Sequence, residues 1–185
     1  MRLRASLHPR LTQIVLSSLF FSAICLASTH AVQMPPDQGS PQATAVPQTH
    51  VPFPDTSDRS SVRITLERSG CLGRCPAYSV TISGDGRVDY SGGQFTAVRG
   101  ERHSRVSYDD VSKLIEKFRA DDFFSLEHSY GIVNDSPIFT VTFTADGKTK
   151  QVTHAGGDLG VVTDLEKEID RVSGSARWVK GRWRL

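Results

Sequence analysis

Residues 78–90 read YSVTISGDGRVDY, and this segment carries the clearest structural signal of the chain. Apolar and polar residues alternate on both sides of a Gly-Asp-Gly centre, which is the pattern of two half-buried strands. Asp-Gly favours a tight turn because glycine accepts a positive φ without steric cost. The segment therefore predicts an antiparallel hairpin with one apolar face, and that face must be covered by another part of the chain.

Further strands are predicted on both sides of this hairpin. Residues 62–67 and 139–143 show the same alternation, and residues 102–107 show a weaker form of it. A second Asp-Gly turn, at Asp146, joins the segment 139–143 to an alternating segment at 149–153. The chain therefore predicts two tight hairpins and two additional strands.

Two amphipathic helices are predicted. The first follows Ser107, which has Asp110 three positions later as in an N-terminal capping pattern. The second starts near Asp158 and ends at Gly174, a natural C-terminal stop. Each has one apolar stripe at helical spacing. The two stripes comprise Val111, Leu114, Ile115 and Phe118 in the first helix, and Val162, Leu165, Ile169 and Val172 in the second.

The predicted element order is β-β-β-β-α-β-β-α. Tight hairpins indicate antiparallel pairing, and each element has one apolar face. The economical packing is an α+β fold, an antiparallel sheet with both helices packed on one face. Residues 62–185 have the size of a single domain. The order of the strands within the sheet does not follow from the sequence.

Residues 1–31 have the pattern of a secretory signal peptide. The first ten residues carry three arginines and no acidic residue, an apolar stretch follows at 11–27, and small residues lead to Ala31. The apolar stretch of 17 residues lies at the short limit for a membrane span, so a retained anchor is the lesser alternative. Another alternative is a lipoprotein modified at Cys25. The prediction is an exported protein, periplasmic or extracellular, without a stable transmembrane anchor.

Residues 32–61 are predicted to form a disordered linker. They hold six of the nine prolines of the chain among polar residues, with little apolar surface to offset the entropy of ordering. Without residues 1–31 the chain has 19 Lys+Arg against 20 Asp+Glu. A net charge near zero removes the electrostatic basis for broad nucleic-acid binding.

Two cysteines, Cys71 and Cys75, are the only thiols left after signal removal. In an oxidising compartment they will pair, bind a metal or act in redox chemistry. The leading interpretation is a structural disulfide that closes a small loop between the first two strands. A redox role is supported by Arg74, which could lower a thiol pKa. The Cys-x-x-x-Cys spacing, one longer than the usual redox motif, and Pro76 leading into a strand argue against it.

A metal site needs two more ligands besides the cysteines. The histidines available in the domain are His103, His128 and His154, and none lies at ligand spacing from another or from a cysteine. No metal and no cofactor are therefore predicted, and no catalytic residues are assigned. An enzyme is the less favoured class.

One face of the sheet is predicted to be lined with hydroxyl groups. Serines and threonines occupy the polar positions of two strands, at 79, 81 and 83 and at 140, 142 and 144. Such a face can bind a polymer such as a glycan or remain solvated. This pattern motivates a binding-module interpretation, because nothing else in the domain resembles a catalytic site.

The run Cys71-x-Gly73-x-Cys75-Pro76-x-Tyr78 resembles the opening motif of a bacterial family of domains of unknown function (DUF6438). The resemblance extends over about residues 62–172. Weaker matching features are Gly86, Tyr90, Gly92, Gly100, Phe118, Phe123, Phe124 and Asp135 before Pro137. The family implies no activity, substrate or cofactor, but it indicates that Cys71 and Cys75 belong to the design of the domain.

The sequence thus predicts an exported, envelope-associated protein. Its most favoured function is a non-enzymatic binding or interaction module, stabilised by the short disulfide loop. An envelope polymer or a protein is the expected ligand. The alternative is a thiol-disulfide oxidoreductase or redox sensor that uses Cys71 and Cys75. Gly73, Pro76, Tyr78 and Asp135 are the further candidate site residues.

Overall fold

The structure is a computed structural model that describes residues 49–131 and 135–180. The predicted signal peptide, and the predicted linker as far as residue 48, lie outside the described residues. The strands are β1 (Arg63–Arg68), β2 (Tyr78–Ser83), β3 (Arg87–Gly92), β4 (Gly100–Arg105), β5 (Ser129–Tyr130), β6 (Ile138–Ala145) and β7 (Lys148–Ala155). The helices are α1 (Tyr108–Ala120), α2 (Val161–Ser173) and α3 (Ala176–Val179), with 3₁₀ turns η1 (Arg59–Ser61) and η2 (Phe123–Ser125).

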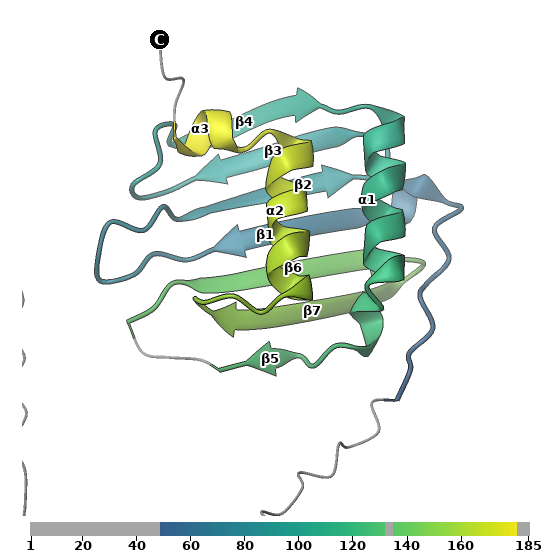
Figure 1. The fold of residues 1–185 in the computed structure, drawn as a ribbon. Coiled ribbons are helices and arrows are strands. Elements are labelled where there is room, and N and C mark those ends of the chain that lie inside the picture. Colours follow the sequence, from purple (N-terminus) through teal and green to yellow (C-terminus); the bar gives the residue numbers. More distant parts are fainter. Residues whose placement is uncertain (1–48, 132–134, 181–185) are drawn as a thin grey trace, which may run out of the picture. The chain divides into compact units, whose positions relative to one another are not determined.

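The seven strands form one sheet in the order β4-β3-β2-β1-β6-β7-β5. Helices α1 and α2 lie side by side across one face of this sheet (Figure 1). All neighbouring strands are antiparallel except β5 and β7, which run parallel. The predicted α+β class, with two helices on one face of an antiparallel sheet, is confirmed.

Local signals formed the elements largely as predicted. Ser107 caps α1, since its side chain accepts a hydrogen bond from the backbone N–H of Asp110 at 3.0 Å. Gly174 ends α2 with a φ of 65°, and its N–H donates to the carbonyl of Arg171. Strand β4 begins and ends two residues earlier than predicted, because the chain must turn before the cap of α1.

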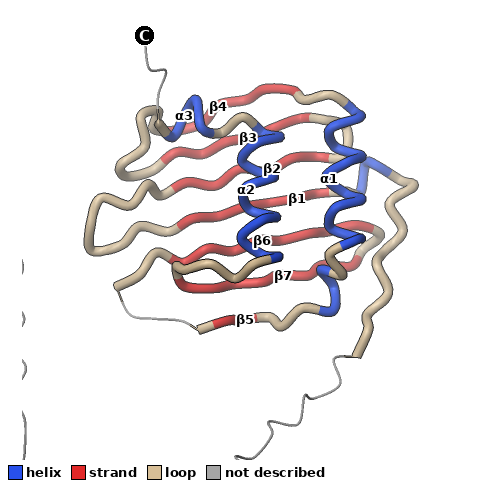
Figure 2. Tube along the Cα trace, in the orientation of Figure 1, coloured by secondary structure: helices blue, strands red, loops and turns tan. Residues whose placement is uncertain are grey.

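Two short elements could not be predicted from the spacing of apolar residues. Strand β5 has two residues and α3 has four, which is too short for either repeat to show. Figure 2 shows where both elements lie in the fold. Strand β5 pairs in parallel with β7, with Ser129 beside Thr153 and Tyr130 beside His154.

The core lies between the sheet and the two helices. Side chains alternate along each strand, and the positions facing the helices hold the buried apolar residues. An aromatic cluster fills the end beneath α1, where Phe118 packs on Phe123 and Phe143 with ring centroids 4.9 and 5.1 Å apart. Aromatic edge-to-face packing adds to the stability gained from burial.

The last part of the predicted linker contacts this core. Phe53 packs on Phe143 and Phe124, with centroid distances of 5.0 and 5.3 Å. The backbone N–H of Val51 donates to Ser125 Oγ at 2.8 Å, and Pro54 is buried. The packed region of the described chain therefore begins before residue 62. Composition suggested a linker because the apolar surface of this segment resides mainly in a single phenylalanine.

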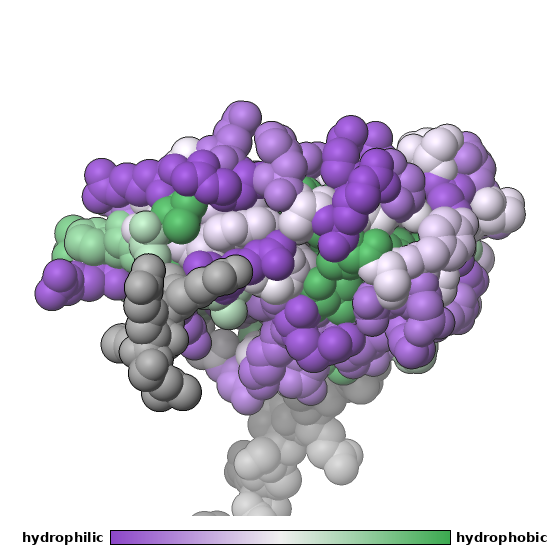
Figure 3. Space-filling model, turned by 90° about the horizontal axis from the view of Figure 1, so that it is seen from above, coloured by the Kyte–Doolittle hydropathy of each residue, from purple (hydrophilic) through white to green (hydrophobic). Residues whose placement is uncertain are grey.

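The two edges of the sheet are blunted. Strand β4 reads GERHSR, and four of its six side chains carry or can carry charge. The surface above this edge is largely hydrophilic (Figure 3). Charged edge strands oppose pairing with another chain, and the opposite edge is only two residues long. Within the described residues, no helix is both long enough and apolar enough to cross a membrane.

Candidate functional site

The loop between β1 and β2 carries the cysteine motif. Cys71 and Cys75 form a disulfide, with their Cα atoms 5.6 Å apart. The backbone N–H of Gly73 lies 3.2 Å from Cys71 Sγ inside the small ring. Ser69 anchors the loop to β6, because its N–H donates to the carbonyl of Ile138 and its Oγ accepts from the N–H of Ile138, both at 2.8 Å. The disulfide expected from the sequence is therefore present on a loop tied to the sheet.

Removing this disulfide should lower stability measurably. The bridge closes a ring of five residues, for which the chain-entropy model gives about 2 kcal/mol. We expect the double variant Cys71→Ser, Cys75→Ser to lose about that much free energy of unfolding in a urea titration. Reduced wild-type protein is the matched control and should melt with the variant. If neither the variant nor the reduced protein has a lower melting temperature, the disulfide does not stabilise the fold. Redox chemistry would then become the leading interpretation.

A cavity of about 450 Å³ lies beside the disulfide loop on the helix-covered side of the sheet. Its walls include Cys75, Pro76 and Tyr78 of the motif, Arg68 at the end of β1, Phe139 of β6 and Asp170 of α2. This volume falls in the range of small-molecule sites. Three of the residues singled out by the sequence therefore meet at one cavity.

Asp170 is the central hydrogen-bond acceptor of the cavity. Tyr78 Oη donates to Asp170 Oδ1 at 2.8 Å, and Arg68 Nη2 donates to Asp170 Oδ2 at 2.8 Å. Ser175 Oγ donates to the same carboxylate. Burial, and then the adjacent Asp170 carboxylate, raise the pKa of the Tyr78 phenol well above its ordinary value. Tyr78 is therefore a fixed hydrogen-bond donor rather than a base.

The polar contacts extend inward from Asp170, through Arg68, to a second carboxylate. Arg68 Nη2 lies 3.5 Å from Glu166 Oε2, and Glu166 Oε1 lies 2.5 Å from His154 Nε2. Both His154 and Glu166 are almost fully buried, with 1% and 3% of their side chains exposed. His154 Nδ1 lies 3.0 Å from the carbonyl oxygen of Ala155. Because a carbonyl oxygen can only accept, Nδ1 is the donor of this hydrogen bond. The result is a continuous chain of ionisable groups that runs from the buried His154–Glu166 pair through Arg68 to the partly exposed Asp170 at the cavity.

Aromatic rings hold the central guanidinium in place. Arg68 lies over the rings of Phe139 and Tyr78, 4.9 and 5.8 Å from their centroids. A guanidinium stacked on ring faces and paired with carboxylates has little freedom to move. The cavity floor is therefore a rigid, charge-paired surface.

Sequence reasoning missed this network, although a signal was present. Arg68 and His154 follow apolar residues at period two and so fall on the inner faces of their strands. Glu166 and Asp170 are four residues apart and border the apolar stripe of α2. Acidic residues beside a buried stripe, together with basic residues at inward strand positions, indicate a buried ion-pair network.

The remaining candidates lie apart from one another. His103 is on the uncovered face of the sheet, His128 is exposed just before β5, and His154 is buried under α2. Within the described parts of the chain, no three His, Cys, Asp or Glu side chains gather as a metal site would require. Asp135 is exposed, with a φ of 66°. Its neighbour Pro137, two residues on, lines the cavity.

The other face of the sheet presents the predicted hydroxyl groups. Cross-strand hydrogen bonds join Thr65 to Thr81 at 2.9 Å and Thr140 to Thr153 at 3.2 Å. The helices cover only the opposite face (Figure 1). Paired threonine hydroxyls stabilise neighbouring strands, so part of this face has a structural role.

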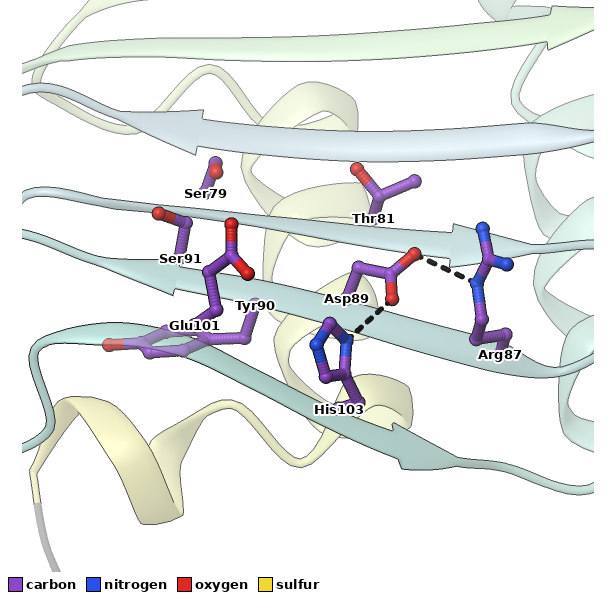
Figure 4. Close-up of a pocket in the computed structure, with 8 residues that line it drawn as sticks. All are labelled: Ser79, Thr81, Arg87, Asp89, Tyr90, Ser91, Glu101 and His103. Carbon is purple, nitrogen blue, oxygen red and sulfur yellow. Dashed lines mark hydrogen bonds and ion pairs between the residues drawn. The ribbon is translucent and has the colours of Figure 1, made fainter.

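A shallow groove of about 470 Å³ crosses this face over β2, β3 and β4 (Figure 4). Asp89 lies at its centre, with Oδ1 2.8 Å from His103 Nδ1 and Oδ2 2.9 Å from Arg87 Nε. Burial alone would raise the pKa of Asp89, but hydrogen bonds from His103 and Arg87 outweigh it and hold the pKa below its ordinary value. Asp89 is therefore a charged acceptor already engaged by its neighbours.

Together these features define a class: a small disulfide-looped α+β domain, with a seven-stranded sheet covered on one face and a cavity beside the loop. The model of a family described as "Domain of unknown function (DUF6438)" matches residues 62–173. The chain belongs to this family, which confirms the resemblance seen in the sequence. A search of the curated proteins finds no match.

Proposed function

We propose that this chain is an exported, non-enzymatic binding module whose ligand occupies the cavity beside the disulfide loop. One observation carries the proposal: Cys75, Pro76 and Tyr78 of the motif line a cavity whose floor is fixed by the Arg68–Asp170 ion pair. Binding sites are typically such preformed hollows, with apolar walls and a few oriented polar groups.

The walls of the cavity favour a ligand with a planar apolar part. Phe139 and the largely buried Tyr78 line the cavity beside Arg68, which lies over both rings, and Pro76 and Pro137 add apolar surface without flexible side chains. Rigid rings and prolines lose little conformational entropy when a ligand packs on them. An aromatic or similarly flat group would therefore fit this surface.

The charges at the cavity favour an anionic group on the same ligand. Arg68 is paired with carboxylates, whereas Arg74 and Lys180 have no carboxylate within ion-pair distance among the residues that the structure describes. Two cations at the rim of a cavity attract and orient an anion. We therefore propose a small anionic ligand, or the anionic end of a larger one.

Export is part of this proposal, and its main support comes from the sequence. The first 31 residues have the pattern of a signal peptide, and a disulfide persists best in an oxidising compartment. These two features together support a periplasmic or extracellular location. Measuring the N-terminus of the protein recovered after expression with its leader would test it, since an intact Met1 would contradict export by cleavage.

The binding proposal can be tested by NMR titration with N-acetylphenylalaninate as an anionic aromatic probe. We expect saturable shift changes at Tyr78, Phe139 and the disulfide loop. Arg74→Gln should weaken binding about tenfold because it removes one charged donor. Arg99→Gln, an equal charge change in the β3–β4 loop, is the matched control. No shift change at the cavity, or equal weakening by both variants, would contradict the proposal.

A redox function is the second candidate, since Cys75 lines the cavity and Arg74 stands beside it. The double serine variant separates the two functions. A binding module should retain the probe with reduced stability. A redox protein should have a reduction potential well above that of a structural bridge, and mild reductant should open the bridge.

A further inference from the structure

A second, smaller cavity lies on the uncovered face of the sheet, where η1 meets the β2–β3 turn. Its volume is about 170 Å³, and its lining includes Arg59, Arg63, Ser83 and Arg87. These residues come from η1 and from three adjacent strands. The cavity is separate from the disulfide loop, which lies between the opposite ends of β1 and β2.

The strand register concentrates arginines at this end of the uncovered face. Arg63 of β1 pairs directly with Ser83 of β2, and Arg87 of β3 pairs directly with Arg105 of β4. Like charges directly opposite one another in a sheet are destabilising. The shallow groove over β2, β3 and β4 on this face has Arg87 at this end and Glu101 at the other (Figure 4). The uncovered face is therefore basic at one end and acidic at the other. An anion at the basic end would relieve the repulsion.

One buried hydroxyl at this cavity has no hydrogen-bond partner among the described residues. Ser83 is only 2% exposed, and its Oγ is buried without a hydrogen-bond partner among the described residues. Arg59 Nη1 is also buried without a partner among the described residues, but the Arg59 guanidinium lies against α1, where it stacks on Tyr108 and its Nη2 donates to Ser112 Oγ at 3.2 Å. Buried donors are normally satisfied, and leaving one unpaired is costly. The Ser83 hydroxyl is therefore suited to an acceptor that enters between the side chains of Arg63 and Arg87.

The charge of the side chains around this cavity is net positive, even when the nearby carboxylates are counted. Asp85 also lines the cavity, but it is exposed and its Oδ1 accepts the backbone N–H of Arg87 at 3.1 Å. Asp58 Oδ1 is engaged by the N–H and hydroxyl of Ser60. Arg87 shares its Nε with Asp89, and its other two nitrogens are not part of that bond. Three arginines and one carboxylate residue thus line the cavity.

We infer that this cavity binds a tetrahedral oxyanion, a phosphate or sulfate group. The donors would be Ser83 and the guanidinium groups of Arg63 and Arg87. Guanidinium groups match the geometry of such anions, and a hydroxyl supplies one more directed donor. The cavity has room for several waters or for one such anion. This inference does not depend on the proposed ligand of the disulfide-loop cavity.

The test is calorimetric titration of the exported protein with inorganic phosphate, and in parallel with inorganic sulfate. We expect one anion per chain for either salt and a phosphate-dependent rise in melting temperature. Ser83→Ala and Arg63→Gln should each weaken binding about tenfold. Ser83→Ala should fold without loss in the absence of the anion, because the hydroxyl has no partner to lose. Arg102→Gln is the matched control, since it removes the same charge from β4 on the opposite face.

A second arm distinguishes a free anion from a lipid headgroup. Vesicles containing phosphatidylglycerol should sediment with the protein if a headgroup phosphate is the natural occupant, and inorganic phosphate should compete. Binding of inorganic phosphate without vesicle binding identifies a soluble anion, and both results support the site. Equal weakening by Arg102→Gln would reveal diffuse attraction only. No binding of either probe would show that water satisfies the donors. Either of these last results overturns the inference.

Discussion

Asp170→Ala should lower the free energy of unfolding by about 3 kcal/mol, one of the two largest effects that we expect from a single substitution. The carboxylate accepts hydrogen bonds from Arg68, Tyr78 and Ser175. Removing it leaves a phenol and a guanidinium in a largely buried setting without their main acceptor. About a quarter of the Asp170 side chain is exposed, so water softens the loss relative to a fully buried pair.

A urea titration of the variant measures this loss, and helix α2 itself offers the control. Asp164 pairs with Lys167 at 3.1 Å, and both side chains are more than half exposed. We expect Asp164→Ala to change stability by less than about 0.5 kcal/mol. If the two variants lose the same amount, the buried network contributes no more than a surface ion pair. Its role would then be to position the cavity rather than to stabilise the fold.

The contrast between these two aspartates shows what the sequence can and cannot reveal. Both lie on α2, far along the chain from the cysteine motif, and composition treats them alike. Only the pairing of β1 beside β6 brings Arg68 and Phe139 to one end of the helix. That pairing joins residues about seventy positions apart, and no local pattern encodes it. The network was therefore unpredictable in detail, although the inward position of Arg68 was a usable signal.

Local patterns succeeded where the determinant was itself local. The alternation in β2 and β6 and the Asp-Gly turns depend on the strand period and on backbone sterics. The cysteine spacing was likewise sufficient to suggest the loop. The anchoring of Phe53 was different, because its partners Phe143 and Phe124 lie far along the chain. A proline-rich segment with a single aromatic residue looks like a linker until the surface that receives the ring is known.

Gly84→Ala is the other substitution with a large expected effect. A Cβ at this position would lie 2.1 Å from the carbonyl oxygen of Arg59 and 2.9 Å from Val62 Cβ. The obstacle is backbone, and it is held in place because the N–H of Gly84 donates to the carbonyl of Val62 at 3.0 Å. The turn and η1 must separate to admit the methyl group. We expect a loss of about 3 kcal/mol in the free energy of unfolding, a high value for overpacking.

Gly70 provides the matched control for Gly84→Ala, measured in the same thermal and urea unfolding series. Neither glycine has a positive φ, so alanine is conformationally acceptable at both, and no atom lies within 4 Å of a Cβ built at Gly70. Gly70→Ala should therefore leave stability nearly unchanged. Equal stability of both variants would mean that η1 is not held against the turn. Because Arg59 and Ser60 of η1 form part of the cavity wall, displacing η1 should also weaken phosphate binding, whereas Gly70→Ala should retain it. The steric contact at Gly84 thus couples the fold to the proposed oxyanion site, and the two readouts should fail together.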